Sequence, residues 1–330
     1  MTLTVDKASL GIVIPVWNLP DDLVHLLEQV SQMGIFSEIV VSDDGSNKSC
    51  DPAELGFTED RLGARLVYLR SPEQRGAGHA RNIALSSVTA HNLLFFDADD
   101  HLAPGLSAIW QQHLDADCPD FTIFRHSDSR VKEREGREGT FYNEEMRWRL
   151  ALGTRPAAIL TLAEAVELCS ISSYPWNKIY RTDFLREAEI SCSETPVHND
   201  IRLHWLSFLK ARRIQADARI GAVHIIQDRT HHLTVRQGVE RLCVGPILQE
   251  LGAILQENPG CQIFLRQFIQ FADELCRWNL DHIDPLIMPD FKRLMIEFYM
   301  QLSPEDFRFF SAWRPDQAEE IVTFLLQEGC

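Results

Sequence analysis

The sequence predicts an α/β fold with a helical C-terminal part. Between residues 10 and 96, short apolar runs rich in β-branched side chains alternate with segments of helical periodicity. This alternation is the pattern of βαβ units around a parallel sheet. From about residue 236 onward, apolar residues recur only at helical spacing, and Pro-containing turns separate the segments. A chain of 330 residues is long enough for one large domain and a smaller one.

The first elements follow from continuous apolar runs and from the turn residues between them. Residues 10–16 (LGIVIPV) predict a strand that is buried on both faces. Asp21 and Asp22 favour a helix start, and Gly34 ends the helix that the apolar spacing predicts. In the same way we expect strands over 38–42, 65–69 and 91–96 and a helix over 78–88.

The middle of the chain has weaker patterns. Residues 125–145 are polar and carry both charges, which predicts a loop or a solvated hairpin. We expect a helix over 157–169, a turn, short strand and helix within 173–190, a helix over 200–212 and a last strand over 223–226.

The charge balance narrows the classes of partner. The chain has 48 acidic and 32 basic side chains and a net charge of −16. Nucleic acid and anionic membrane surfaces are disfavoured as partners, because their phosphates would be repelled. A phosphate-bearing ligand would therefore need a local basic patch, a helix N-terminus or a metal ion.

The cysteines and the N-terminus point to a cytoplasmic location. The eight cysteines are irregularly spaced without a C-x-x-C pair, which predicts reduced and mostly buried thiols. Asp6 and Lys7 are unlike a secretory signal, and no run reaches the about 20 apolar residues of a transmembrane helix. Peripheral contact with the inner face of a membrane stays open.

Two predicted strands end in acidic clusters. Asp44 lies in the turn after the second strand, and Asp97 and Asp99 follow the strand over 91–96. Ligands bind outside the carboxyl ends of parallel strands, so these side chains are expected on one rim. Two carboxylates one residue apart can hold a hard divalent cation, Mg²⁺ or Mn²⁺, which would neutralise a diphosphate leaving group. The alternative for each cluster is a capped or solvated turn.

Four blocks in order resemble the family 2 glycosyltransferases of the GT-A fold, of bacterial type. They are GIVIPVWN, EIVVSDDGSN, QRGAGHARNIAL and FFDADD, and a weaker likeness follows in PWNKIYRTDFL and HNDIRLHW. The resemblance implies a Rossmann-like mixed sheet flanked by helices. The expected organisation is a catalytic domain over 1–235, with a nucleotide-sugar half at about 8–105 and an acceptor half at about 106–235, followed by a helical subdomain over 236–330.

The resemblance assigns the donor site to the strand ends. Pro15, Trp17 and Asp44 match the positions that hold the nucleoside, with Asp44 accepting a hydrogen bond from the imide of a uracil-like base. Asp97 would contact the ribose or the donor sugar. Asp99 would be the principal metal ligand, with Asp97 as a second ligand and Asp100 close by.

The loop and helix of QRGAGHARNIAL add a basic position. Arg81 matches a family residue near the base and the phosphates. Gly76 and Gly78 would let the backbone approach the ligand. They complete no dinucleotide fingerprint, because Arg81 replaces its last glycine.

Asp200 matches the catalytic base of the family. Such a carboxylate removes the proton from the acceptor hydroxyl as its oxygen attacks the anomeric carbon. Asn199 stands where many relatives have an acidic residue, which leaves its role open. The alternative role of Asp200 is a helix N-cap, and Glu194 and His198 are the next candidates for the base.

Four residues are assigned to acceptor or phosphate contacts on weaker grounds. Trp176 would stack on a sugar face or belong to the core, as we expect for Trp205. Lys178 would pair with a phosphate or with a nearby carboxylate. Arg229 and His231 fall in a stretch that resembles the family's loop over the diphosphate.

The resemblance implies an inverting, hexosyltransferase-type enzyme. It would move a sugar from a nucleoside-diphosphate donor, with a UDP-sugar favoured, to a hydroxyl of a glycan or lipid-linked glycan, as in cell-surface polysaccharide synthesis. One alternative is a nucleotidyltransferase, which usually has a Gly-rich, basic loop where this chain has PVWNLPDD. The other is a non-catalytic nucleotide-binding relative. The apolar residues of the helical tail would form the core of a subdomain. The alternative is that they form the interface of a homodimer.

Overall fold

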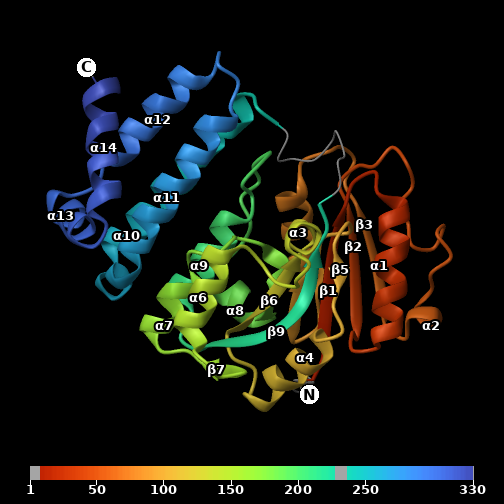
Figure 1. Cartoon of the computed structure of the whole chain (residues 1–330). Coiled ribbons are helices and arrows are strands. Elements are labelled where there is room, and N and C mark those ends of the chain that lie inside the picture. The colour runs from red at the N-terminus through yellow and green to blue at the C-terminus, as the bar shows by residue number, and fades with distance from the viewer. Residues whose placement is uncertain (1–7, 227–235, 330) are drawn as a thin grey trace.

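A mixed sheet is the centre of the structure, a computed structural model that describes residues 8–226 and 236–329 (Figure 1). Its strands over these residues are β1 (Leu10–Val16), β2 (Glu38–Asp43), β3 (Arg65–Arg70), β4 (Asn92–Phe95), β5 (His101–Leu102), β6 (Phe121–Asp128), β7 (Ala157–Ile159), β8 (Lys178–Arg181) and β9 (Ile214–His224). Their order is β3-β2-β1-β4-β8-β6-β9-β5, and β7 pairs with β9 outside this path. β3, β2, β1 and β4 are parallel, whereas β8 is antiparallel to both of its neighbours.

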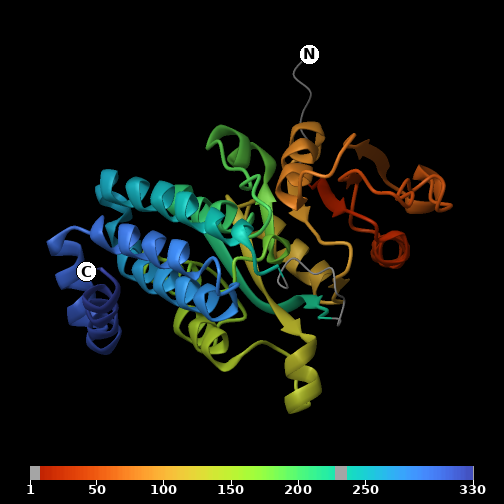
Figure 2. The ribbon, with the colours of Figure 1, turned by 90° about the horizontal axis from the view of Figure 1, so that it is seen from above.

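Helices flank the sheet and make up the C-terminal part. In chain order they are α1 (Pro20–Met33), α2 (Glu59–Leu62), α3 (Ala77–Ser87), α4 (Leu106–Asp115), α5 (Ser129–Glu135), α6 (Tyr142–Leu152), α7 (Leu162–Leu168), α8 (Thr182–Glu187), α9 (Ile201–Lys210), α10 (Val244–Glu257), α11 (Gln262–His282), α12 (Met288–Met300), α13 (Pro304–Trp313) and α14 (Pro315–Glu328). Short 3₁₀ turns are η1 (Pro175–Asn177), η3 (Val239–Cys243) and η4 (Pro259–Cys261). In Figures 1 and 2, α10 to α14 lie at the end of the molecule opposite α1 and α2. Over the described ranges, none of these helices has the length and apolar content to span a bilayer.

The parallel half forms because its strands are buried on both faces. Every residue of β1 is buried, and its side chains alternate between two apolar cores. Val13 packs with residues of α3, whereas Ile12 and Ile14 pack on the other face with α1 and α4. α1 starts with Pro20 in its first turn and ends at Gly34, whose φ is +63°.

Most elements predicted from the sequence are confirmed within a residue or two at their ends. These are the strands β1 to β4, the helices α1, α3 and α9, the η1-β8-α8 segment and the helices of the C-terminal part. The seven cysteines in the described residues are free and five of them are buried, as expected, while Cys330 lies outside the described residues.

One of the two cores continues from the sheet into the C-terminal helices. It contains Phe95 of β4, Trp205 of α9, Phe268 of α11 and Ile321 of α14. Trp205 is fully buried and meets Phe268 edge-on, with ring centroids 5.2 Å apart. The prediction that Trp205 belongs to the core is therefore confirmed. The division into domains near residue 236 stays a prediction.

The prediction of a loop or solvated hairpin over 125–145 is wrong. β6 runs to Asp128, α5 follows, and α6 begins at Tyr142. The end of β6 carries polar side chains, His126 and Ser127, that are buried beside β9. The start of β6 is apolar, with Phe121, Ile123 and Phe124 fully buried, but apolar spacing could not reveal its polar end, which its partners in the sheet keep inside.

Two further boundaries differ from the prediction. The helix expected over 157–169 is split: β7 occupies the start, and α7 begins after Thr161, which forms a capping box with Glu164. The last strand is not limited to 223–226, since β9 begins at Ile214 and pairs with β6 over most of its length.

Candidate active site

The carboxyl ends of β1, β2 and β4 meet at one edge of the sheet. β1 pairs in parallel with both neighbours, and backbone hydrogen bonds continue past the strand ends. The N–H of Asp44 donates to Val16 O at 2.9 Å, and the N–H of Phe96 donates to Val13 O at 2.8 Å. The turns that follow these strands are therefore held side by side, which places the predicted donor residues along a single rim.

The predicted donor residues differ in exposure along this rim. Pro15 is buried inside β1, and Trp17 directly after the strand is partly exposed. Asp97 and Asp99 follow β4 and are partly exposed. Side chains that can meet a ligand thus stand at the rim, but their contacts with a nucleotide stay a prediction.

Asp44 holds the loop that leads into α3. Its side chain is 3% exposed, and its two carboxylate oxygens accept from the backbone N–H groups of Arg75 at 2.8 Å and Gly76 at 2.7 Å. Gly76 has a φ of +99°, a conformation that favours glycine. Each oxygen keeps a second acceptor position. Asp44 therefore has a structural role beside the predicted contact with a base.

Gly78 is the point of closest approach between α3 and residues 193–200, which we call the base segment. A Cβ at this position would lie 2.0 Å from Ser193 O and 2.9 Å from Asn199 Cβ. The expectation that Gly78 makes room for a ligand is wrong, because protein backbone fills that space.

Arg81 joins the rim to the base segment. It is 4% exposed, its guanidinium forms an ion pair with Asp97, and its Nη1 donates to Asn199 Oδ1 at 2.8 Å. Burial acts to lower the pKa of Arg81, but the Asp97 carboxylate outweighs it and raises the pKa. The two terminal nitrogens of the buried cation thus have partners on opposite sides, whereas its buried Nε has no hydrogen-bond partner in the structure.

Asp200 ends the base segment and precedes α9. It occupies the N-cap position, but its side chain makes no capping hydrogen bond. Burial raises the pKa of its carboxyl, while the charge of Arg81 acts in the opposite direction. The carboxylate is therefore not used in holding the helix, and its role as a base stays a prediction.

The other candidates near Asp200 are engaged in hydrogen bonds. Glu194 accepts from the side chains of Arg75, His79 and Asn82 at 2.9, 2.9 and 3.3 Å. Burial would raise the pKa of Glu194, but Asn82 and His79 lower it. A carboxylate with three donors and a lowered pKa is a weak proton acceptor.

The acidic cluster after β4 offers two carboxylates for a metal ion. Asp100 is turned inward, where its Oδ1 accepts from His224 Nδ1 and Ile225 N, both at 2.9 Å. In residues 8–226 and 236–329, no three Asp, Glu, His or Cys side chains are grouped as metal ligands would be. A site for Mg²⁺ or Mn²⁺ at Asp97 and Asp99 stays a prediction, and such a site would take its remaining ligands from substrate phosphates and water.

Trp176 and Lys178 lie inside the protein. Trp176 is 1% exposed and stacks on Tyr174, with ring centroids 4.5 Å apart. Lys178 is fully buried, its Nζ donates to Tyr174 O at 2.7 Å and to Asn177 Oδ1 at 2.6 Å, and burial lowers its pKa to about 7. Sugar stacking by Trp176 and a phosphate contact by Lys178 have no support from this geometry, which favours core roles.

Two predicted residues cannot be placed, and one partner was missed. Arg229 and His231 lie outside the described residues. Sequence reasoning left the role of Asn199 open, although it is the second partner of Arg81 across 118 positions of the chain. The only signal in the sequence was its place next to Asp200.

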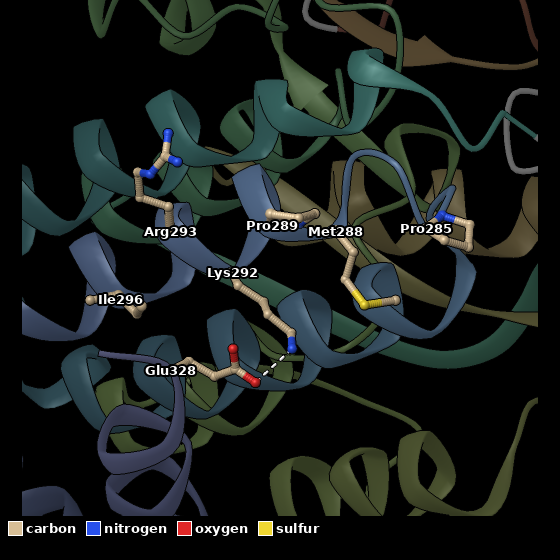
Figure 3. A pocket seen from close by; sticks show the side chains of 7 residues that line it. All are labelled: Pro285, Met288, Pro289, Lys292, Arg293, Ile296 and Glu328. Atoms are coloured by element: carbon tan, nitrogen blue, oxygen red, sulfur yellow. Dashed lines mark hydrogen bonds and ion pairs between the residues drawn. The ribbon is translucent and has the colours of Figure 1, made fainter. Parts of the chain in front are cut away.

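The C-terminal helices carry a separate hollow of about 400 Å³ (Figure 3). Met288, Lys292 and Arg293 of α12 line it together with Glu328 of α14, and Lys292 Nζ pairs with a Glu328 carboxylate oxygen at 2.6 Å. No predicted donor or catalytic residue lines this hollow. The rim of the sheet, where the titratable residues converge, is therefore the better candidate.

Comparison with known proteins gives a family similarity for the first half of the chain. The model described as "Glycosyl transferase family 2" matches residues 11–168. Residues 11–168, slightly less than half of the chain, are thus similar to glycosyl transferase family 2. Asp44, Arg81 and Asp97 fall inside the family 2 segment, whereas Asp200 lies beyond it.

Relatives and solved structures resemble different parts of the chain. Galactofuranosyltransferase GlfT2 of Mycolicibacterium smegmatis is 29% identical over 105 residues, which are 30% of this chain and 16% of that protein. The chain thus spans less than a fifth of the length of this relative. S. aureus TarS 1–349 in complex with UDP-GlcNAc matches with a TM-score of 0.73 and 15% identity, over 97% of this chain and 92% of that one.

A second solved structure has the same fold. The mannosyltransferase PcManGT from Pyrobaculum calidifontis, in complex with GDP-Man and Mn²⁺, matches with a TM-score of 0.55 and 13% identity, over 99% of this chain and 89% of that one. The expected GT-A fold, with a mixed sheet, flanking helices and a helical C-terminal region, is confirmed.

The packing at Gly78 predicts a large effect of a single methyl group. Gly78→Ala should lower the free energy of unfolding by about 2 kcal/mol or more, because the added Cβ meets backbone that cannot yield. Gly252→Ala in α10 is the matched control, since its Cβ would meet only Phe268 at 3.7 Å. That variant should be neutral or more stable by up to about 1 kcal/mol. Urea unfolding of both proteins measures the difference, and equal stabilities would contradict the close approach.

Proposed function

We propose that the chain is an inverting glycosyltransferase that uses a nucleoside-diphosphate sugar. The observation that carries the proposal is the position of Arg81, which binds Asp97 of the donor rim and Asn199 of the base segment. One buried cation thus brings the proposed donor site and the proposed base, Asp200, into one place.

The proposed donor site lies along the rim. Pro15, Trp17 and Asp44 hold the nucleoside, Arg81 lies near the base and the phosphates, and Asp97 contacts the ribose or the sugar. A UDP-sugar is the favoured donor, and the complex of TarS with UDP-GlcNAc supports that choice by similarity of fold.

Asp99 and Asp97 are the proposed ligands of Mg²⁺ or Mn²⁺. When bound, the ion neutralises the charge that develops on the diphosphate leaving group. The Mn²⁺ complex of PcManGT supports this proposal. In a protein of net charge −16, few other groups could compensate a diphosphate.

The proposed chemistry is a single displacement. The carboxylate of Asp200 takes the proton of an acceptor hydroxyl as that oxygen attacks the anomeric carbon. The bond from the anomeric carbon to the diphosphate breaks, the nucleoside diphosphate leaves from the opposite face, and the configuration inverts.

The proposed acceptor is a hydroxyl of a glycan or lipid-linked glycan, as in cell-surface polysaccharide synthesis. The enzyme would meet it in the cytoplasm or at the inner face of a membrane. We divide the chain into a catalytic domain over 1–235 and a helical subdomain over 236–330. A nucleotidyltransferase is disfavoured, because the turn after β1 lacks the Gly-rich, basic loop of that class.

Metal dependence is the first test of the donor site. UDP should bind at least about tenfold more tightly with Mn²⁺ than with EDTA, and Asp99→Asn should remove this gain. Asp60→Asn, at an exposed position of α2, changes the net charge equally and should keep the gain. Calorimetric titration measures all three proteins. Equal affinity of the unaltered protein in both buffers would contradict the metal-bridged donor.

The base is tested by a second substitution. Asp200→Asn should reduce turnover at least about 100-fold with UDP affinity and melting temperature nearly unchanged, because its side chain caps no helix. Glu194→Gln should retain turnover. Burial raises the pKa of Asp200, so the rate should fall with decreasing pH from a value above the about 3.9 of an ordinary Asp. Release of UDP from the sugar donor measures turnover, and near-normal transfer by Asp200→Asn would place the base elsewhere.

A further inference from the structure

The base segment, residues 193–200, crosses the seam between α3 and the C-terminal helices. On one side Arg81 holds it through Asn199. On the other side Cys243 Sγ donates to Val197 O at 3.3 Å, and the ring of His198 is hydrogen-bonded to α11. A hollow of about 430 Å³ runs along this seam between the segment and α10. Because side chains do not fill this space, the position of the base segment depends strongly on its hydrogen bonds.

Asn279 of α11 is the residue that His198 contacts. Its Oδ1 lies 3.0 Å from His198 Nε2 and accepts from Arg241 Nη1 at 2.7 Å, while its Nδ2 donates to Leu275 O at 2.8 Å. These partners fix the orientation of the amide, since a flipped amide would aim its N–H₂ at Arg241 and its oxygen at the carbonyl. His198 must therefore carry its proton on Nε2.

His198 has an unusual backbone conformation two residues before Asp200. Its φ is +56°, in the left-handed region that non-glycine residues seldom adopt. Such a conformation is energetically unfavourable and persists only where surrounding contacts hold it. The contact of the imidazole with Asn279, which is fully buried, is one that can do so.

We propose that Asn279 is a positioning residue for catalysis: through His198 it fixes the turn of the base segment that aims Asp200 at the acceptor. The C-terminal helices are then a part of the catalytic apparatus through this contact. This inference rests on the proposed role of Asp200 as the base.

Two substitutions break the contact in different ways. Asn279→Ala removes the acceptor shared by His198 and Arg241, and it also removes a partner of the buried Arg241. His198→Asn leaves Arg241 paired and keeps a residue type that tolerates a positive φ, but its side chain is too short to replace the imidazole. Tyr299→Phe is the matched control, because it deletes a buried hydrogen bond within the same helices, from the Tyr299 hydroxyl to Asp273 Oδ1 at 2.6 Å. The hydrogen bonds that Asp273 accepts from Arg277 and Gln317 also stay within the C-terminal helices.

Amide hydrogen exchange of residues 193–200 tests the clamp without any substrate. Exchange should rise about threefold or more in His198→Asn and Asn279→Ala and stay unchanged in Tyr299→Phe. Turnover of a UDP-sugar, measured as UDP released, should fall about 3- to 10-fold in kcat in the two variants, as expected for one lost hydrogen bond. KM for the donor and the affinity for UDP should change less than twofold.

Three results distinguish the outcomes. Unchanged exchange in His198→Asn would overturn the clamp. If His198→Asn and Asn279→Ala raise the exchange but leave kcat unchanged, and Asp200→Asn abolishes turnover, the positioning role is overturned. If Asp200→Asn retains turnover, Asp200 is not the base, and Asn279 then has no base to position. The exchange data still decide whether Asn279 holds the segment.

Discussion

The buried guanidinium of Arg81 is the constraint on which the rest of the site depends. A cation that is 4% exposed requires partners, since leaving it unpaired would cost several kcal/mol. Asp97 supplies the charge, and Asn199 supplies a hydrogen-bond acceptor. These two residues are far apart in the sequence, so the contacts of one side chain align the end of β4 with the base segment.

Other features of the fold serve the same alignment. The loop before α3 is held by the two oxygens of Asp44, and α3 can approach the base segment because Gly78 has no Cβ. On the far side, His198 reaches Asn279 in the C-terminal helices. The apolar core that joins Trp205 to Phe268 keeps these helices at a fixed distance from the sheet. The position of Asp200 thus depends on packing at both ends of a short segment.

The sequence predicted the parallel half of the fold and its rim because their signals are local. Buried strands such as β1 are continuous apolar runs, and the acidic residues that end them are adjacent in sequence. The rest depends on contacts between distant residues. β6 carries buried polar side chains that only its neighbours explain, and His198 is 81 positions from Asn279. The sequence left Trp176 open between sugar stacking and the core, and only the contacts of the folded chain show that it is buried.

The central claim is that Arg81 and Asp97 act as one unit, and a double-mutant cycle measures this most directly. Asp97→Asn alone should lower the free energy of unfolding by about 2 kcal/mol or more, because Arg81 stays buried without a countercharge, a cost that the partial exposure of Asp97 moderates. The double mutant with Arg81→Gln should lose less free energy of unfolding than the sum of the losses of the two single mutants, by at least about 1 kcal/mol. Urea unfolding in the presence of EDTA gives the three values. Losses that simply add, within about 0.5 kcal/mol, would contradict the coupling and with it the link between the donor rim and the base segment.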